Sequence, residues 1–246
     1  MLGTLHRLSL ALNHCICPLI SGDTKSSGRG GRDASDNCRN KISVFDLEGR
    51  YVRCFGERGK GEGQFDSPCG ICFTADCNLV VAKQDNRRVQ IVREDGSFVR
   101  ASGSAPAWGE NGQFDDYDPI DVSVGPDGSI AVLHKGELTS RVQIFDGKGR
   151  FVRSIGEWSI ESGGREPGGL MDSTGVAHGT TGGEMIIVRD KGRQDVQAVG
   201  GKGGLLQIVG ANGDSKVAWH SLKPELGFGQ LAGVAVDANG ADSCHS

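Results

Sequence analysis

Several things are scarce in this chain of 246 residues. It has three Trp, two Tyr and seven Pro, and no apolar run approaches the ~20 residues of a membrane-spanning helix. No Asn-X-Ser/Thr site for N-glycosylation occurs, which argues against secretion. The net charge is only −4, so neither DNA nor a membrane surface is an expected partner. These absences favour a cytoplasmic protein.

Metal-ligand patterns are incomplete. Cys69, Cys72 and Cys77 have a spacing like half of a zinc site, but no second pair of Cys or His accompanies them. In an extended strand, side chains three residues apart point to opposite faces, so Cys69 and Cys72 would diverge. The acidic run 115–118 lacks the spacing of a calcium loop. We therefore expect free thiols, and neither a metal site nor a cofactor.

Glycine, by contrast, is abundant. The chain contains 40 Gly, which is about 16% of its residues and roughly twice ordinary usage. No Gly-X-Y period is present, which excludes collagen, and a hydrophobic content of 37% is too high for a fully disordered chain. This composition indicates many short strands joined by tight turns.

Three segments repeat the same hairpin: 41–56, 88–103 and 141–156. Each has a strand of alternating Val or Ile, a turn containing Gly, and a second strand reading Phe/Tyr-Val-Arg. A further element precedes another strand pair. It is Gly-Gln-Phe at 63–65 and 112–114, and Gly-Gln-Leu at 229–231. One unit therefore contains four strands in about 45–50 residues, a period typical of β-propeller blades.

The spaced pattern Gly-Gln-Phe, Pro-x-Gly-Ile, Asn-x-Arg-Val-Gln-Ile and Asp-Gly-x-Phe-Val resembles the NHL repeat. It is most similar to the C-terminal NHL propellers of tripartite-motif proteins. The resemblance implies a recognition module for protein or RNA partners. It also implies that ubiquitin-ligase activity belongs to a separate RING domain, and no RING-type Cys/His series occurs in this chain.

The predicted fold is all-β: an NHL-type propeller of four-stranded antiparallel blades. Residues 1–35 match no repeat and are expected to form a divergent, flexible segment, without the cleavage site of a signal peptide. The propeller would occupy 36–246, with clear units at 36–61, 63–104 and 112–157, a weaker unit at 169–210 and a partial one at 228–246. This length fits about four to five blades, whereas the family usually closes with six. We therefore expect an incomplete ring.

The family places an Asp, then an Arg five residues later, before Val-Gln-Ile, and the resemblance implies that the two pair between strands. Asp36 and Lys41 keep a version of this pair, but Lys83 replaces the acid ahead of Arg88. Asp195 replaces the base after Asp190, where Arg193 lies between them. If the pairs are structural, two blades would hold an unpartnered charge and be looser.

The alternative is that these basic residues are exposed. Lys83 and Arg88 would then form a small basic spot with Arg87, and Arg141 has no matching acid ahead of it. The candidate partner-binding residues are Lys83, Arg87, Arg88 and Arg141.

Two further features have competing explanations. Arg53, Arg100 and Arg153 recur at one strand position, where they would contact phosphates or, as we favour, keep a solvated outer strand from pairing with other chains. His178 is the histidine best placed for catalysis, because it lies on a predicted inner strand. Some propellers of related sequence are lyases, but a single His makes no site, and we favour a structural role.

The predicted function is therefore non-catalytic recognition of a protein partner through the propeller loops. RNA binding is the alternative, and a propeller lyase or hydrolase is the third possibility.

Overall fold

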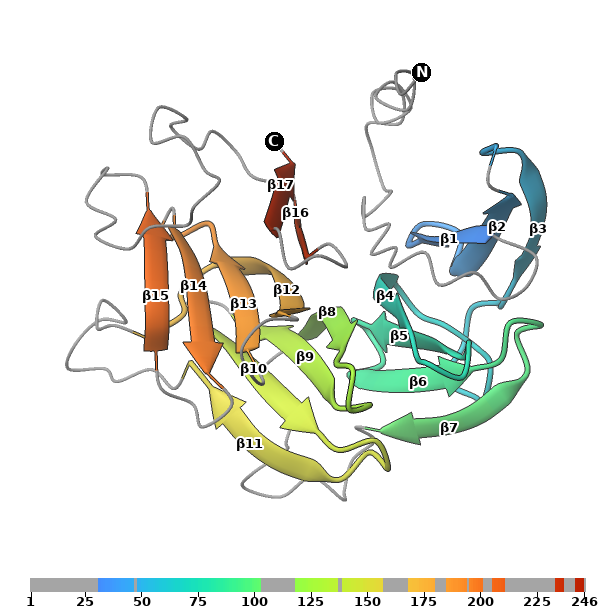
Figure 1. Ribbon diagram of the computed structural model, residues 1–246. Helices are drawn as coiled ribbons and strands as arrows, with labels where there is room; N and C mark the ends of the chain where they lie inside the picture. The colour runs from blue at the N-terminus through green and yellow to red at the C-terminus, as the bar shows by residue number, and fades with distance from the viewer. Residues whose placement is uncertain are drawn as a thin grey trace.

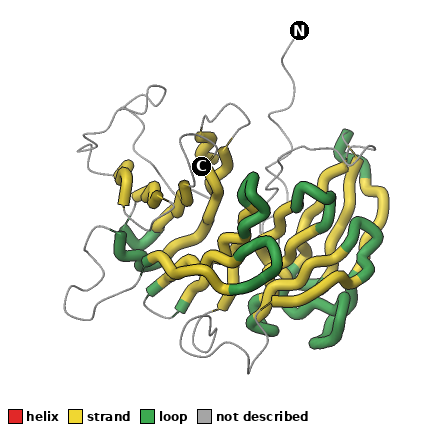
Figure 2. Tube along the Cα trace, turned by 60° about the horizontal axis from the view of Figure 1, so that its bottom comes forward, coloured by secondary structure: helices red, strands yellow, loops and turns green. Residues whose placement is uncertain are grey.

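The computed structural model describes residues 31–46, 48–102, 118–136, 139–156, 168–179, 185–193, 195–200, 205–210, 233–236 and 242–245. Within these ranges the chain is all-β and contains no helix, as the strands and loops in Figure 2 show. No helix long and apolar enough to cross a membrane is therefore found in the described residues.

The strands form five antiparallel sheets, which we call blades 1 to 5. Blade 1 contains β1 (Gly31–Asp36), β2 (Lys41–Asp46) and β3 (Tyr51–Phe55). Blade 2 contains β4 (Pro68–Phe73), β5 (Leu79–Lys83), β6 (Arg88–Val92) and β7 (Phe98–Ser102). Blade 3 contains β8 (Asp118–Val124), β9 (Ile130–Lys135), β10 (Ser140–Phe145) and β11 (Phe151–Ile155). Blade 4 contains β12 (Ser173–Gly179), β13 (Met185–Asp190), β14 (Asp195–Gly200) and β15 (Leu205–Gly210), and blade 5 contains β16 (Gly233–Val236) and β17 (Asp242–His245).

The blades are arranged around a common centre. Figure 1 shows β4, β8, β12 and β16 innermost and β3, β7, β11 and β15 outermost, with blades 1 and 5 at the two ends of an open arc. The predicted incomplete propeller of four-stranded blades is thus confirmed. One boundary differs, because β1 begins at Gly31, inside the segment expected to precede the repeats, and pairs along its length with β2.

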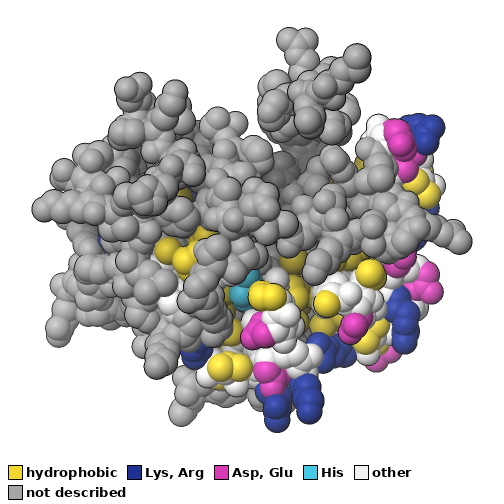
Figure 3. All heavy atoms as spheres, in the orientation of Figure 1, with side chains coloured by type: hydrophobic (Ala, Val, Ile, Leu, Met, Phe, Trp, Pro, Cys, Tyr) yellow, Lys and Arg dark blue, Asp and Glu magenta, His cyan; other side chains and the backbone are white. Residues whose placement is uncertain are grey.

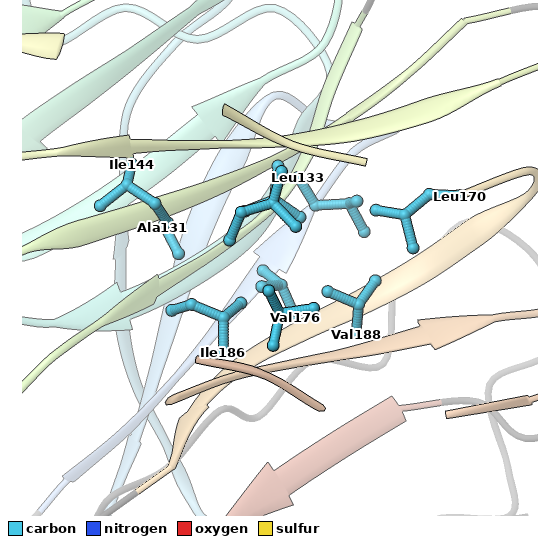
Figure 4. Packing of buried hydrophobic residues seen from close by; sticks show 10 residues of the cluster. Ala131, Leu133, Ile144, Leu170, Val176, Ile186 and Val188 are labelled. Carbon is cyan, nitrogen blue, oxygen red and sulfur yellow. The ribbon is translucent and has the colours of Figure 1, made fainter. Parts of the chain in front are cut away.

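The hydrophobic core lies between adjacent blades. Figure 4 shows Ala131, Leu133 and Ile144 of blade 3 facing Val176, Ile186 and Val188 of blade 4, with Leu170 beside them. Two similar clusters join blade 2 to blade 3 and blade 1 to blade 2. Because strand side chains alternate, each central strand supplies one face to each neighbouring blade. This double burial explains why Leu79–Ala82 and Ile130–Leu133 are continuous apolar runs.

A hydrophobic side chain also fills the joint between successive blades. Phe65, fully buried, lies against Gly56, where a Cβ atom would come within 2.4 Å of the Phe65 ring. Leu170 lies against Gly156 in the same way, at 2.5 Å. Both glycines have positive φ, of 92° and 86°. Gly-Gly-Leu at 168–170 is thus a counterpart of Gly-Gln-Phe that the sequence comparison missed, whereas 112–114 and 229–231 lie outside the described residues.

Candidate functional site

The residues predicted to bind a partner lie around the hairpin that joins the second and third strands of blades 2 and 3. Strand register places four residues in one equivalent position, namely Asp36, Lys83, His134 and Asp190. Their cross-strand partners are Lys41, Arg88, Arg141 and Asp195. His134, fully buried, escaped the sequence comparison because the longer loop that follows it shifts the spacing to Arg141. Counting back from the Val-Gln-Ile strand through the hairpin register would have found it.

Blade 4 shows what a carboxylate does in this position. Asp190 accepts hydrogen bonds from the backbone N–H of Met171 at 2.6 Å, of Asp172 at 3.1 Å and of Arg193 at 3.1 Å. The first two belong to the loop that enters the blade. Asp190 therefore fixes this loop against the strand that follows it.

In blade 2 the equivalent residue is Lys83, which donates a hydrogen bond to the entering loop where Asp190 accepts hydrogen bonds. Its Nζ donates a hydrogen bond to the carbonyl of Gln64 at 2.6 Å and lies 5.7 Å from the centre of the Phe65 ring. The side chain is completely buried, and this burial lowers the pKa of the Lys83 ammonium to about 7. The alternative in which Lys83 belongs to an exposed basic spot is wrong, because Lys83 is buried and holds the entering loop from inside the blade.

The expected unpartnered charges are also satisfied. Arg88 donates hydrogen bonds to the carbonyls of Gly61, at 2.7 Å, and of Lys60. In blade 4, Arg193 pairs with Asp195 at 3.1 Å, and both side chains are largely buried. The prediction of unpartnered charges in these two blades is therefore wrong. Each substituted charge has a partner nearby in the structure. The remaining predicted residue, Arg141, is half buried and lies opposite His134 on the adjacent strand.

Glutamine of the Val-Gln-Ile strand holds the same entering loops. Gln90 accepts a hydrogen bond from the N–H of Gly63 at 3.1 Å and donates one to the carbonyl of Gly61 at 3.0 Å. Gln197 donates to the carbonyl of Gly169 at 3.0 Å. In blades 2 and 4 this Gln therefore positions the entering loop, whereas Gln143, its counterpart in blade 3, has no side-chain hydrogen bond in the described structure.

Arg87 is the most accessible of the predicted residues. Its side chain is 54% exposed, and its Nε lies 3.6 Å from the carboxylate of Asp118 on blade 3. Beside it, Arg58 pairs with Asp66 at 3.3 Å. We define the blade-2 loop face as residues 57–67, 84–88 and 118.

The blade-2 loop face mixes both signs of charge. Its basic residues are Arg58, Lys60, Arg87 and Arg88. Its acidic residues are Glu57, Glu62, Asp66, Asp85 and Asp118. Four positive against five negative charges give −1, so this face is not a basic patch. Figure 3 shows a similar interspersion of Lys/Arg and Asp/Glu along the margin of the face that it draws.

The recurring outer-strand arginines connect neighbouring blades. Arg53 on β3 donates a hydrogen bond to the carbonyl of Glu94 in the outer turn of blade 2. Arg100 on β7 donates to the carbonyl of Gly147, the equivalent turn residue of blade 3, at 2.5 Å. The structure thus gives these two arginines a role that neither sequence explanation included, because their guanidinium groups connect adjacent blades.

His178 belongs to a hydrogen-bonded chain between blades 3 and 4. Its Nδ1 lies 3.1 Å from Ser123 Oγ and its Nε2 lies 3.2 Å from Ser129 Oγ, which donates to Asp127 at 2.6 Å. Burial lowers the pKa of His178 to about 4, so the ring is neutral at pH 7. With both ring nitrogens engaged, the geometry fits the structural role that the sequence favoured.

The cysteines of the metal-like spacing form no disulfide. Cys69 is buried, and its thiol donates to the carbonyl of Ser67 at 3.2 Å, while Cys72 and Cys77 are partly exposed. In the part of the chain that the structure describes, no group of three or more His, Cys, Asp or Glu side chains could hold a metal ion. The acidic run 115–118 lies outside the described residues except for Asp118.

No protein-family model matches the chain. Over 104 residues, 42% of the chain, it is 33% identical to the protein brain tumor of Drosophila melanogaster. Over 48 residues, 20% of the chain, it is 40% identical to the protein lin-41 of Caenorhabditis elegans. Both relatives are TRIM-NHL proteins. The chain is a β-propeller that is similar in part of its sequence to these TRIM-NHL proteins.

The matched parts of this chain span only 10% and 4% of the lengths of these two relatives. Among solved structures, this chain is similar to a catalytically inactive His-to-Ala variant of virginiamycin B lyase from Staphylococcus aureus, with a TM-score of 0.53 and 11% identity. That match covers 88% of this chain and 66% of the lyase. At this identity the likeness concerns the fold alone.

Proposed function

We propose that the chain is a non-catalytic recognition module that binds a protein partner through the blade-2 loop face. The observation that carries this proposal is the mixture of charges around Arg87, where positive and negative groups alternate and nearly cancel. A protein surface offers both signs and can match such a pattern, whereas nucleic acid offers a dense line of negative charge. A cytoplasmic location is part of the same proposal.

The positions of the predicted residues support this choice. Lys83, Gln90 and Arg88 donate to or hold the backbone of the entering loop, which leaves Arg87, Arg58 and their acidic neighbours as the groups presented to solvent. A loop fixed by buried hydrogen bonds loses little conformational entropy on binding. The face is thus suited to recognition by a rigid surface.

We propose no catalytic activity for this chain. His178 is neutral, and its hydrogen-bonding groups are occupied by Ser123 and Ser129. The similarity to a lyase is one of fold and supplies no catalytic residue. Ubiquitin ligation, if it belongs to the full-length relatives, would be the property of a domain other than the propeller.

The proposal is tested by affinity capture with the immobilised full chain, followed by identification of the bound proteins. Arg87→Glu should lower recovery of the specific partner at least ~10-fold, since reversing a charge at the contact places like charges together. Arg150→Glu is the matched control, because Arg150 is also an exposed arginine in an ion pair but lies in an outer turn. Equal loss with both variants would count against the blade-2 loop face.

The RNA alternative is separated by ultraviolet crosslinking to a random RNA pool. We expect weak labelling that Arg87→Glu does not change. Strong labelling of the natural chain that Arg87→Glu abolishes would indicate that the partner is RNA rather than a protein.

A further inference from the structure

Blade 1 differs from blades 2, 3 and 4 by one strand. In each of those blades an innermost strand, β4, β8 or β12, pairs with the next strand of the sheet. The sheet of blade 1 has the order β1-β2-β3, and its β1 corresponds by register to β5, the second strand of blade 2. Among the described strands, β1 therefore has a partner on one edge only, and it is the innermost strand that Figure 1 shows in its blade.

The other edge of β1 has the geometry for strand pairing. The pairing of β1 with β2 continues from Gly31 to Asp36 without a register shift. A regular strand presents alternate N–H and C=O groups along its outer edge, and an extended peptide can add there as a further strand.

Strand register in the complete blades defines the side chains that such a peptide needs. The position that corresponds to Ala34 faces a β-branched apolar residue in each of them, namely Ile71, Val122 and Val176. The position that corresponds to Asp33 faces the next residue of the same strand, which is small in each blade: Cys72, Ser123 and Ala177. The added strand should therefore carry Val or Ile followed by a small residue.

Asp33 specifies the chemistry of this small residue. Asp33 is 6% exposed and Ser35 is 1% exposed, and in the described structure neither Asp33 Oδ2 nor Ser35 Oγ has a hydrogen-bond partner. Directly opposed residues on one face of a sheet have Cβ atoms about 4.5–5.5 Å apart, so a short hydroxyl side chain opposite Asp33 can reach its carboxylate. Ser or Thr would supply the missing donor, whereas Ala would leave the carboxylate oxygen unsatisfied.

The residue before the apolar position also follows from the other blades. It is Gly70 in β4 and Gly175 in β12, and a Cβ atom on Gly70 would lie 2.4 Å from the Cα atom of Asp121 on the next blade. In β8 it is Asp121, which is 3% exposed and whose carboxylate accepts the N–H of Val176 at 2.9 Å. A strand added beside blade 2 should therefore carry Gly or Asp at this place.

The chain's own sequence does not supply a matching strand. The two residues that pair at the position of Ala34 are ten apart in the sequence in blades 2 and 3, and twelve apart in blade 4. Ten and twelve residues before Ala34 are Thr24 and Gly22, and neither is Val or Ile. The full pattern of Gly or Asp, Val or Ile, and Ser or Thr occurs only at 121–123, within β8, which already pairs with β9.

We propose that blade 1 binds an extended segment of a partner protein along the free edge of β1, and that this segment reads Gly or Asp, then Val or Ile, then Ser or Thr. Backbone hydrogen bonds to β1 hold the segment in the sheet, and its hydroxyl group donates to Asp33 Oδ2. This surface lies outside the blade-2 loop face, so the proposal goes beyond the recognition proposed for that face.

The test is fluorescence anisotropy of a labelled peptide titrated with the full chain. The peptide is Pro-Ile-Gly-Val-Ser-Val, which is the sequence of 119–124 with glycine in place of Asp121. The titration is made at about pH 8, because burial raises the pKa of Asp33 to about 6 and the carboxyl is then ionised. We expect saturable binding, and about tenfold weaker binding of the peptide with Ala in place of Ser, which cannot donate to the carboxylate.

Two N-methylated peptides test the pairing itself. In an added strand alternate N–H groups face β1, so methylation of one alternate set of nitrogens should abolish binding and methylation of the other set should be tolerated. Binding of both methylated peptides would contradict addition to the sheet.

Asp33→Val is the variant that tests the donor. It should bind the Ser and Ala peptides with affinities equal within about twofold, because the acceptor is gone. Asp146→Asn, which removes a carboxylate from a turn of blade 3, is the control and should keep the tenfold preference.

Three results would overturn the proposal: no saturable binding of the Ser peptide, equal affinity of the natural chain for the Ser and Ala peptides, or loss of the preference in Asp146→Asn. A dimer of the full chain that the peptide does not dissociate would assign the edge to a second copy instead. The peptide is the only ligand in these titrations, so their outcome does not depend on a partner of the blade-2 loop face.

Discussion

Blades 1 and 2 share one backbone pattern but differ in what they bury. Strand register places Asp33 and Ser35 of blade 1 where blade 2 has Val80 and Ala82. All four positions are almost fully buried. In the described structure, Asp33 Oδ2 and Ser35 Oγ have no hydrogen-bond partner. The same repeat thus carries a polar lining in one blade and an apolar one in the next.

The difference shows that a blade can bury polar side chains and still pack against its neighbour. Ile42 of blade 1 still packs on blade 2, in the cluster with Phe65 and Leu79. Burial raises the pKa of Asp33 from 3.8 to about 6, although Arg53 opposes the shift. A buried carboxylate without full compensation is costly, so blade 1 should be the less stable of the two blades.

The largest effect is expected where the two blades share a side chain. Phe65→Ala removes a fully buried ring between Gly56 and the blade 2 core and should lower the free energy of unfolding by about 3–5 kcal/mol. Chemical denaturation monitored by circular dichroism measures it. Val99→Ala, at a partly exposed outer position, is the control and should change stability by less than about 0.5 kcal/mol. A small loss for Phe65→Ala would show that blade 1 is not docked through this ring.

The next effect comes from giving blade 2 the lining of blade 1. Val80→Asp places a carboxylate among apolar side chains and should lower the free energy of unfolding by about 3 kcal/mol at pH 7. Val80→Thr, similar in shape, separates the effect of charge from that of volume. If Val80→Asp is tolerated as well as Val80→Thr, the polar lining of blade 1 has no energetic consequence.

The reverse exchange should stabilise the protein. Asp33→Val removes a buried carboxyl and should raise the free energy of unfolding by about 1–2 kcal/mol at pH 7. The folded-state pKa of Asp33 lies above its ordinary value, so the natural chain loses stability as pH rises from about 4 to about 6. Thermal melts across this range should show that the Asp33 contribution to this slope is gone in the variant. An unchanged slope would mean that Asp33 ionises normally in the fold.

The smallest effect concerns the ties between blades. Arg100→Ala removes the hydrogen bond to Gly147 and should lower the free energy of unfolding by about 1 kcal/mol. Arg150→Ala removes only an exposed ion pair with Asp146 and should have a smaller effect on the free energy of unfolding. Urea denaturation of both variants measures the difference. Equal effects would reduce Arg100 to an ordinary surface residue.

The repeats made most of the fold predictable. The alternating strand 88–92, the turn at Gly96 and the strand 98–102 are local features, and each is found where the pattern placed it. The family resemblance then supplied the arrangement of blades. The counterpart at 168–170 was missed because its Gly-Gly-Leu shares with Gly-Gln-Phe only the first glycine and a buried hydrophobic side chain.

The candidate site was less predictable. Arg87 is exposed as expected, but Lys83 is buried, and its partner is a backbone carbonyl that no pattern of side chains reveals. The role of Arg100 likewise depends on a turn 47 residues away in the chain. Asp121 looked like an ordinary strand residue, although it caps an amide of the next blade.

Alternation of apolar residues, glycine turns and the length of the repeat are local properties, so the chain's residues alone specify strands, hairpins and four-stranded blades. The partner of each charge is a different matter. Whether Lys83 faces solvent or Gln64, and whether Asp121 stands alone or holds Val176, depends on which blades become neighbours. Burial and hydrogen bonding between distant segments decide these outcomes. A buried charge is stable only with an ion-pair or hydrogen-bond partner, and the packing of the blades determines which partner lies close enough.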